Sequence, residues 1–479
     1  MNYKKQFLSG TKWNAVRMIT LTLTQLISVL IIGKFISPRE YGLFGMVNVF
    51  IGLAYVFTDA GFSNVIIYKQ ENDSNKLSSV FWINVIVGVI ISISICIIAP
   101  IASRYYNEPQ LKNLIIISSI NFIILPLGQI FISLSKKDLK FRQIALIDIL
   151  SNILQIVFII IFSIIGLGVL SLIYGKIVQS LISSTLYFLF NRKTYKINFY
   201  FNLKEIQDFI SFGLFQLGDR ITNYLKSNID YLIIGKFVGA ETLGIYTLAY
   251  QLIMMPIQKV NPILIDTAFP IFVKFKDNDE KINKNYYKLQ QIIAYILMPI
   301  FALVFILSEE FINQFYGVGW SKAIVLLKIF SFLGIIISLG NPIGCLLNTK
   351  GRPDIGFKWN IISMVLVMVF NLIGINWGIV GVAISTTIYN LIISWPVDFY
   401  IRFKLSNMRI RDYFYNLKNP FIISLCMFFI VLIIRYCSKL IINNNSLIII
   451  ICSLSGILLY FSLIRYFNLE LYREIKNKV

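Results

Sequence analysis

Four basic side chains lie inside otherwise apolar stretches of the sequence: Arg17, Arg220, Lys226 and Lys259. Each charge at the centre of a membrane-spanning helix costs about 2.5 to 3.5 kcal/mol on insertion scales, so it needs a polar partner or a wet cavity. Guanidinium and ammonium groups offer several N–H donors to phosphate oxygens. The four cations are therefore predicted to hold a pyrophosphate group. The alternative is that they pair with nearby acids or extend toward a membrane interface.

Four acids accompany these cations, namely Asp59, Asp219, Asp230 and Asp266. A carboxylate removed from water has a raised pKa and could take up a proton, so these acids are candidates for ion coupling. The alternative is that they only neutralise the four cations. Asp148 and Lys176 are predicted to have a structural role.

Residues 209–237 are the stretch that must position most of these groups. The stretch is long enough to cross a bilayer as a helix, and its polar residues fall on one face of that helix. Within this stripe, Gln216 and Asn223 are predicted to bind the polar part of the same ligand as the cations. The stripe consists of Gln216, Asp219, Arg220, Asn223, Ser227 and Asp230.

The stretch also has an earlier copy in the chain. The sequence LIIGKF at residues 30–35 recurs unchanged at 232–237, and the same offset of 202 residues carries Gly42 onto Gly244. It also carries Asn14, Arg17, Gln25 and Ser28 onto four stripe positions. Two homologous halves are therefore predicted, each opening with a helix whose polar face looks inward.

Composition places the chain in a membrane. Of 479 residues 57% are hydrophobic, against about 45 to 50% in soluble proteins, and the mean hydropathy is +0.74. The sequence has no histidine, and its five cysteines lack the spacing of a metal site or a disulfide framework. We expect no metal, no cofactor and no catalytic activity. The net charge of +21 is explained by topology and not by nucleic acid.

Fourteen membrane spans follow from cutting the sequence at charges, glycines and prolines. Thirty Lys and Arg residues collect in alternate connections and only eight in the others, which predicts that both termini are cytoplasmic. A tight outer hairpin is expected around residues 374–378. The spans lie near residues 13–36, 42–67, 80–103, 113–134, 144–165, 168–190, 209–237, 243–272, 286–308, 323–348, 357–375, 377–401, 419–441 and 446–467.

The predicted architecture is all-α and polytopic, with two pseudo-symmetric six-helix lobes followed by two further helices. No phosphate-binding loop of the Gly-Lys-Ser/Thr type is present, so any transport must be driven by a gradient or by substrate flux. The predicted parts are an N-lobe at residues 1–190, a cytoplasmic linker at 191–208, a C-lobe at 209–402, and the last two helices with a cytoplasmic tail at 403–479.

Several motifs resemble the multidrug/oligosaccharidyl-lipid/polysaccharide exporter superfamily, and within it the Wzx-type flippases. They are SGTKWNAVRM, IGKFISPREYGLFG, DAGFSNVII and VGAETLGIYTLAYQL. The resemblance implies two lobes that alternate access to move undecaprenyl-pyrophosphate-linked oligosaccharide units across the bacterial cytoplasmic (inner) membrane. It also implies a role in O-antigen, capsule or exopolysaccharide synthesis. Its partners would be the lipid bilayer, H⁺ or Na⁺, and a polysaccharide polymerase complex.

Three alternatives stay open. A cation-coupled multidrug exporter of the same superfamily commonly has an acid on its first helix, where this chain has Arg17. A peptidoglycan lipid II flippase concentrates several arginines in its first lobe, where this chain has only that one. A membrane-embedded glycosyltransferase or polymerase usually needs a large outer loop or an exposed acid cluster, and the sequence predicts neither.

Overall fold

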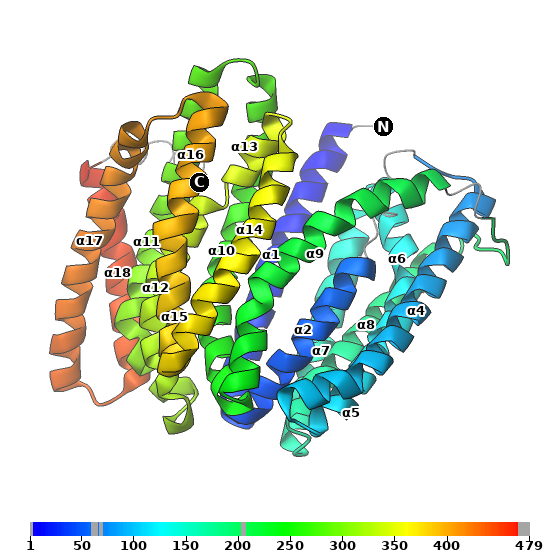
Figure 1. Ribbon diagram of the computed structural model, residues 1–479, viewed down its shortest axis with the longest axis horizontal. Coiled ribbons are helices and arrows are strands. Elements are labelled where there is room, and N and C mark those ends of the chain that lie inside the picture. The colour runs from blue at the N-terminus through cyan, green and yellow to red at the C-terminus, as the bar shows by residue number, and fades with distance from the viewer. Residues whose placement is uncertain (1–2, 59–65, 67–69, 203–206, 468–479) are drawn as a thin grey trace. The chain divides into compact units, whose positions relative to one another are not determined.

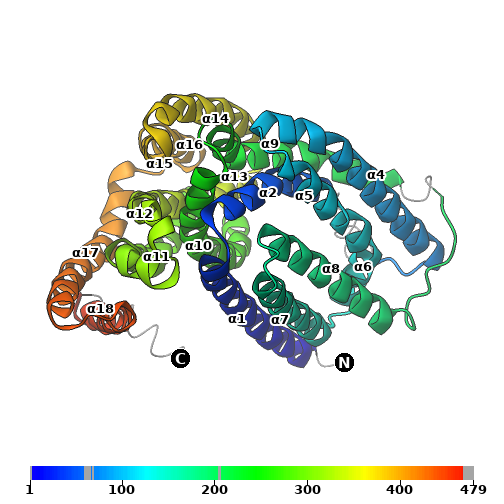
Figure 2. The ribbon, with the colours of Figure 1, turned by 90° about the horizontal axis from the view of Figure 1, so that it is seen from below.

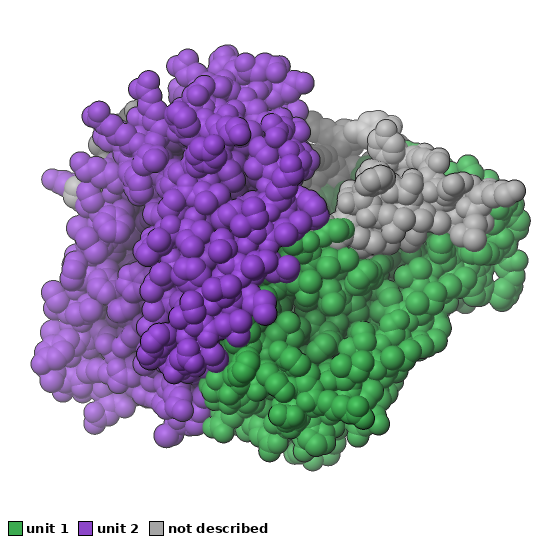
Figure 3. All heavy atoms as spheres, in the orientation of Figure 1, with its two compact units in different colours: residues 1–244 green, residues 245–479 purple. Residues whose placement is uncertain are grey.

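The structure is a computed structural model that describes residues 3–58, 66, 70–202 and 207–467. Every regular element within those residues is a helix (Figure 1), which confirms the all-α membrane fold. The chain forms two compact units, residues 1–244 and 245–479, coloured separately in Figure 3. This division differs from the lobe boundary at 191–208, which was predicted from the sequence repeat and stays a prediction.

Unit 1 is a layer of long helices that pack mainly on their neighbours. Helix α7 lies between α1 and α8, α8 also packs on α6, and α2 packs on α4, α5 and α9 (Figure 2). The helices are α1 (Tyr3–Phe35), α2 (Pro38–Thr58), α4 (Ser74–Tyr106), α5 (Gln110–Ser119), α6 (Asn121–Lys137), α7 (Phe141–Ile164), α8 (Val169–Asn191) and α9 (Gln207–Phe237).

The core of unit 1 joins α4, α6, α7 and α8 near the end where the basic connections lie. Leu77, Phe131, Ile144 and Tyr187 are buried together there. Small residues allow close approach elsewhere, as where Ser92 Oγ donates to Ser119 Oγ over 3.2 Å. Such small-residue contacts hold helices together in a bilayer, where the hydrophobic effect between helices is weak.

The segment that leads from α8 to α9 lies along the start of α4. Ser78 Oγ accepts the backbone N–H of Asn198 over 2.9 Å, and Ser79 Oγ accepts that of Asn202 over 3.1 Å. Trp82 donates its indole N–H to the carbonyl of Asn198 and stacks on Phe199. Much of the predicted linker is therefore held by side chains of one helix.

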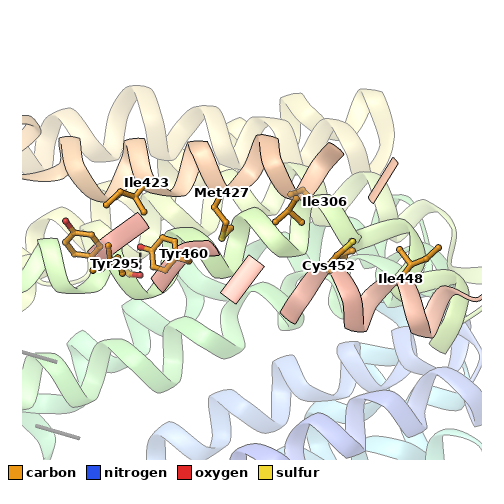
Figure 4. Packing of buried hydrophobic residues seen from close by; sticks show 10 residues of the cluster. Tyr295, Ile306, Ile423, Met427, Ile448, Cys452 and Tyr460 are labelled. Carbon is orange, nitrogen blue, oxygen red and sulfur yellow. Dashed lines mark hydrogen bonds between the residues drawn. The ribbon is translucent and has the colours of Figure 1, made fainter. Parts of the chain in front are cut away.

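Unit 2 is organised around α11, which packs on α12, α17 and α18. Figure 4 shows the apolar contact between α11, α17 and α18, where Tyr460 also donates its hydroxyl to the carbonyl of Tyr295 over 2.8 Å. The elements are α10 (Ala240–Lys274, which begins in unit 1), α11 (Asp279–Phe315), η2 (Val318–Trp320), α12 (Lys322–Gly340), α13 (Ile343–Thr349), α14 (Pro353–Gly374), η3 (Ile375–Trp377), α15 (Gly378–Tyr389), the π-helical turn η4 (Asn390–Ser394), α16 (Trp395–Ser406), α17 (Ile410–Ile441) and α18 (Asn445–Phe467).

Helix ends are set by local polar chemistry. Asp73 accepts the N–H of Asn75 at the start of α4, and Asn278 accepts the N–H of Lys281 at the start of α11. Asn107 and Asn407 end α4 and α16 with left-handed backbone angles, which asparagine tolerates better than most residues. The predicted hairpin near residue 374 is confirmed as a 3₁₀ turn before Gly378, whose φ is +68°.

The described residues contain eleven helical stretches long and apolar enough to cross a membrane. Helices α9 and α10 are not among these eleven. Residues 353–406 are counted as one stretch, although the turn at Ile375–Trp377 divides them. The multi-pass membrane fold is therefore established. The count of fourteen spans stays a prediction.

Candidate functional site

Arg17 lies on α1 beside an acid of α7. Its Nε atom is 2.6 Å from Oδ2 of Asp148, although the N–H is not aligned for a hydrogen bond, so the contact is an ion pair. The Arg17 side chain remains 33% exposed and that of Asp148 18% exposed. Tyr187 of α8 donates its hydroxyl to Oδ1 of Asp148 over 2.9 Å. One carboxylate thus joins three helices.

The ion pair with Asp148 bears on the two interpretations of Arg17, which are binding of a pyrophosphate and pairing with a nearby acid. The acid that meets it is Asp148, which the sequence suggested for a structural role, and not one of the four acids proposed as its partners. The partial exposure of Arg17 leaves part of its guanidinium accessible. Lys176, the other residue with a predicted structural role, donates to Gln179 Oε1 over 2.8 Å on its own helix, α8.

The described part of the polar stripe lies on one face of α9. Arg220 and Lys226 are half-buried, and Asn223 and Ser227, one turn apart, are exposed. Asn223 Oδ1 accepts the hydroxyl of Ser227 over 3.4 Å. Exposed amide and hydroxyl groups on this face of α9 are available to water or to a polar ligand.

Three predicted site residues have side chains outside the part of the chain that the structure describes. Gln216 and Asp219 belong to α9, but their side chains are not among those the structure describes. Asp59 lies outside the described residues.

The side of α9 next to the stripe is fixed against α2. The hydroxyl of Tyr224 lies 2.9 Å from the carbonyl oxygens of both Asn48 and Val49 and donates to them. Gly52 makes room for this ring, because a Cβ there would overlap the Tyr224 hydroxyl. The rotation of α9 about its axis, and hence the direction of its polar stripe, is set by this contact.

Asp230 lies at the buried end of the stripe and is 5% exposed. Its Oδ1 accepts the backbone N–H of Tyr231 over 3.0 Å, and its charge acts on Tyr106 of α4.

The remaining predicted residues lie on α10, in unit 2. Lys259 is half-buried and Asp266 is exposed. The helix continues through Pro256, Pro262 and Pro270 without a break. Asn261, beside one of these prolines, donates its amide to the carbonyl of Ser338 on α12 over 3.0 Å.

The repeat-related glycines meet in the structure. A Cβ on Gly42 would overlap the carbonyl of Ala240, and a Cβ on Gly244 would overlap the carbonyl of Pro38. The two contacts are related by the same offset of 202 residues. A reciprocal contact of this kind is expected where two equivalent helix starts cross on a local two-fold axis, and it supports the predicted repeat.

Sequence reasoning assigned no role to Arg402 of α16, which is fully buried in unit 2. Its guanidinium carbon lies 5.1 to 5.5 Å from the ring centres of Phe399, Tyr413 and Tyr286. The hydroxyls of Tyr286 and Tyr413 and the charge of buried Asp398 act on it. The sequence does contain a signal for this buried site. In WPVDFYIR, aromatic residues and one acid precede Arg402 at helical spacing.

Comparison with known sequences decides the family. The profile of the family described as "Polysaccharide biosynthesis protein" matches residues 29–325. The chain belongs to the polysaccharide biosynthesis protein family. Within that family it is similar to the teichuronic acid biosynthesis protein TuaB of Bacillus subtilis (strain 168), with 30% identity over 431 residues that cover 88% of each chain. It is also similar to the lipopolysaccharide biosynthesis protein WzxC of Escherichia coli (strain K12), with 29% identity over 427 residues, 89% of this chain and 87% of the relative.

A solved structure shares the fold of this member of the polysaccharide biosynthesis protein family. The lipid II flippase MurJ in an inward closed conformation matches 98% of this chain and 99% of its own, with a TM-score of 0.75 and 18% identity. At that identity the likeness concerns the fold alone.

Proposed function

We propose that the chain is a flippase that moves lipid-linked polysaccharide repeat units across the cytoplasmic membrane by alternating access. The observation that carries the proposal is similarity over nearly nine-tenths of the chain to polysaccharide biosynthesis proteins, combined with a transporter fold. A membrane protein of polysaccharide synthesis with such a fold has one evident task, which is to transfer the lipid-linked intermediate. We assign it no catalytic role.

The polar stripe of α9 supplies the chemistry that this task needs. Arg220, Lys226 and Asn223, with Lys259 of α10, would hold the pyrophosphate and the first sugars of an undecaprenyl-linked oligosaccharide. Gln216 and Arg17 would extend this polar lining. The substrate's lipid tail would stay in the bilayer while its polar part moves.

The acids would couple the cycle to an ion. A proton or sodium ion on Asp230, Asp219, Asp59 or Asp266 would favour one arrangement of the lobes, because each arrangement gives the carboxylate a different environment. Release of the lipid would then reset the site. A polysaccharide polymerase complex on the outer side would receive the product, and both termini of the transporter would be cytoplasmic.

The test is transfer in vesicles that contain the purified chain and a polyprenyl-pyrophosphate-linked oligosaccharide. A glycan-cleaving enzyme added outside should reach nearly all of the substrate when the chain is active, and about half of it when no transfer occurs. Changing Arg220, Lys226 and Lys259 together to Gln should slow transfer more than tenfold, since each charge-assisted contact contributes about 1.5 to 3 kcal/mol.

The matched control is Lys236→Gln, which removes a cation from the last turn of the same α9 helix, where it lies over the ring of Tyr105. It should transfer at the wild-type rate. Equal transfer by the triple variant and the wild type would rule out the cation site. Efflux of cationic dyes by the same vesicles, without oligosaccharide transfer, would favour the multidrug alternative.

A further inference from the structure

The surface of unit 2 carries a groove that the transport proposal does not use. It has a volume of about 700 Å³ and lies where α16 ends and α17 begins. Its walls are almost wholly apolar, and Arg409 is the basic residue that lines it. The aromatic part of the wall consists of Trp395, Phe399, Tyr400, Phe403 and Phe414.

The groove is built on a fixed frame. Phe399 packs edge-on against Tyr413 at 4.7 Å and lies 5.8 Å from Phe414. Behind Phe399 lies the buried guanidinium of Arg402, 5.1 Å from its ring centre. These ring contacts hold the back wall of the groove in one arrangement, so a ligand would not have to order it.

The connection that forms the mouth is also held in place. Asn283 of α11 donates its amide to the carbonyl of Ser406 over 2.7 Å, and Tyr287 donates its hydroxyl to the carbonyl of Arg409 over 3.3 Å. Both hydrogen bonds are made to backbone carbonyls and do not involve the Arg409 side chain. That side chain is exposed.

The charges around the mouth match one class of ligand. Lys404 near the end of α16 and Arg411 at the start of α17 lie on either side of Arg409, and Asp412 is the one acid in residues 404–412. The connection is predicted to be cytoplasmic, at the leaflet whose anionic lipids attract basic segments. Aromatic rings are enriched at this depth.

We propose that this groove is a binding site for an anionic phospholipid of the cytoplasmic leaflet. An acyl chain covers the aromatic walls, and the phosphate accepts hydrogen bonds from Arg409. The volume lies within the range of about 300 to 1,000 Å³ seen for small-molecule pockets, whereas the tail of a polyprenyl lipid is much longer than the groove.

Native mass spectrometry of the purified chain tests the site. The probes are phosphatidylglycerol and phosphatidylcholine with identical acyl chains, so only the head group differs. The wild type should retain phosphatidylglycerol about tenfold more strongly than phosphatidylcholine, because both carry the phosphate but the choline cation offsets its charge beside Arg409. Arg409→Gln should remove the preference by lowering retention of phosphatidylglycerol more than that of phosphatidylcholine.

Two further variants separate the groove from the general charge of the connection. Arg411→Gln removes the same charge two residues away, outside the groove lining, and should keep the preference. Ile410→Trp fills the groove and should lower retention of both lipids about tenfold. If that variant does not fold, Ile410→Gln replaces it, because a polar amide opposes acyl-chain binding.

Three results would overturn the site. They are equal retention of both lipids by the wild type, an Arg411→Gln effect as large as that of Arg409→Gln, and displacement of phosphatidylglycerol from the wild type by an equal concentration of a polyprenyl phosphate. The last result would show that the groove takes an isoprenoid tail instead.

Discussion

At the scale of single residues, the described ion pairs separate charges that build the fold from charges that are candidates to bind a ligand. Arg17 has both features, because it pairs with Asp148 and yet remains one-third exposed. Its two roles can be measured separately.

Exchanging the two charges in Arg17→Asp/Asp148→Arg should separate them. Either single change leaves one charge without its partner and should lower the free energy of unfolding by about 1 to 3 kcal/mol, between the values for exposed and buried pairs. The exchange should restore thermal stability because opposite charges again meet. It should not restore transfer, since the cation has moved from α1 to α7. Full transfer by the exchanged variant would make Arg17 purely structural.

Arg402 offers a second residue-scale prediction. Arg402→Ala removes a buried side chain from between three rings and should lower the free energy of unfolding by about 3 to 5 kcal/mol. Arg402→Met keeps the packing but leaves the charge of Asp398 uncompensated, so it should also destabilise. Adding Asp398→Asn to Arg402→Met should recover most of the lost stability in a thermal melt. No recovery in the double variant would show that the two charges do not act on each other.

At the scale of elements, helix contacts depend on small residues at crossings and on polar side chains that hold connections. The crossing at Gly42 and Gly244 is the closest example, since backbone carbonyls occupy the space of both missing side chains. Backbone cannot move aside as a flexible side chain can.

Gly42→Val and Gly244→Val should therefore each disrupt the start of a helix. We expect a loss of more than 2 kcal/mol of stability, typical of overpacking a fixed contact. Gly344→Val is the control, because a Cβ there meets nothing within 4 Å. Fluorescence-detected size-exclusion chromatography after heating compares the three. Similar melting of all three variants would contradict the close crossing.

The contact between the α6–α7 turn and the segment after α8 should depend on pH. Burial raises the pKa of Asp138, but hydrogen bonds from Lys140 and Tyr195 outweigh it and hold that pKa below its usual value. A lowered pKa gives stability that is present above the ordinary value of about 4 and is lost as the pH falls through the lowered one. Asp138→Asn should thus reduce stability at pH 7 and flatten its decline below about pH 4. Tyr195→Phe should act in the same direction, less strongly.

At the scale of the whole molecule, the sequence predicted the helical membrane fold, because long apolar runs permit little else in a bilayer. The offset of 202 residues also predicted which glycines are equivalent. The sequence did not predict that Arg17 meets Asp148, 131 positions away, or that the segment after α8 lies on α4. Such contacts depend on which helices become neighbours and on how each helix is rotated about its axis. The hydropathy of the sequence does not predict either property.

The unequal distribution of Lys and Arg between alternate connections directly predicts the membrane topology of the whole molecule. Single cysteines would be introduced after the five native ones are changed to serine, since Cys437 is exposed and would react. Lys193, in the segment after α8, should be labelled by a membrane-impermeant maleimide only after the membrane is opened. Asn444, between α17 and α18, should be labelled from outside in intact cells. Both positions lie in connections between helices, so a cysteine does not interrupt a helix.

The choice of positions avoids strained backbone. Asn107 and Asn407 lie on opposite predicted sides, but both have positive φ angles, of 56° and 52°, where cysteine would be disfavoured. Labelling of Lys193 from outside together with protection of Asn444 would invert the predicted orientation of every helix between them, whereas a change at one position alone would contradict the predicted number of spans between them. Inversion would also place the connection beside Arg409 outside, away from the anionic leaflet, so this experiment decides at once where substrate enters and which lipids meet the groove.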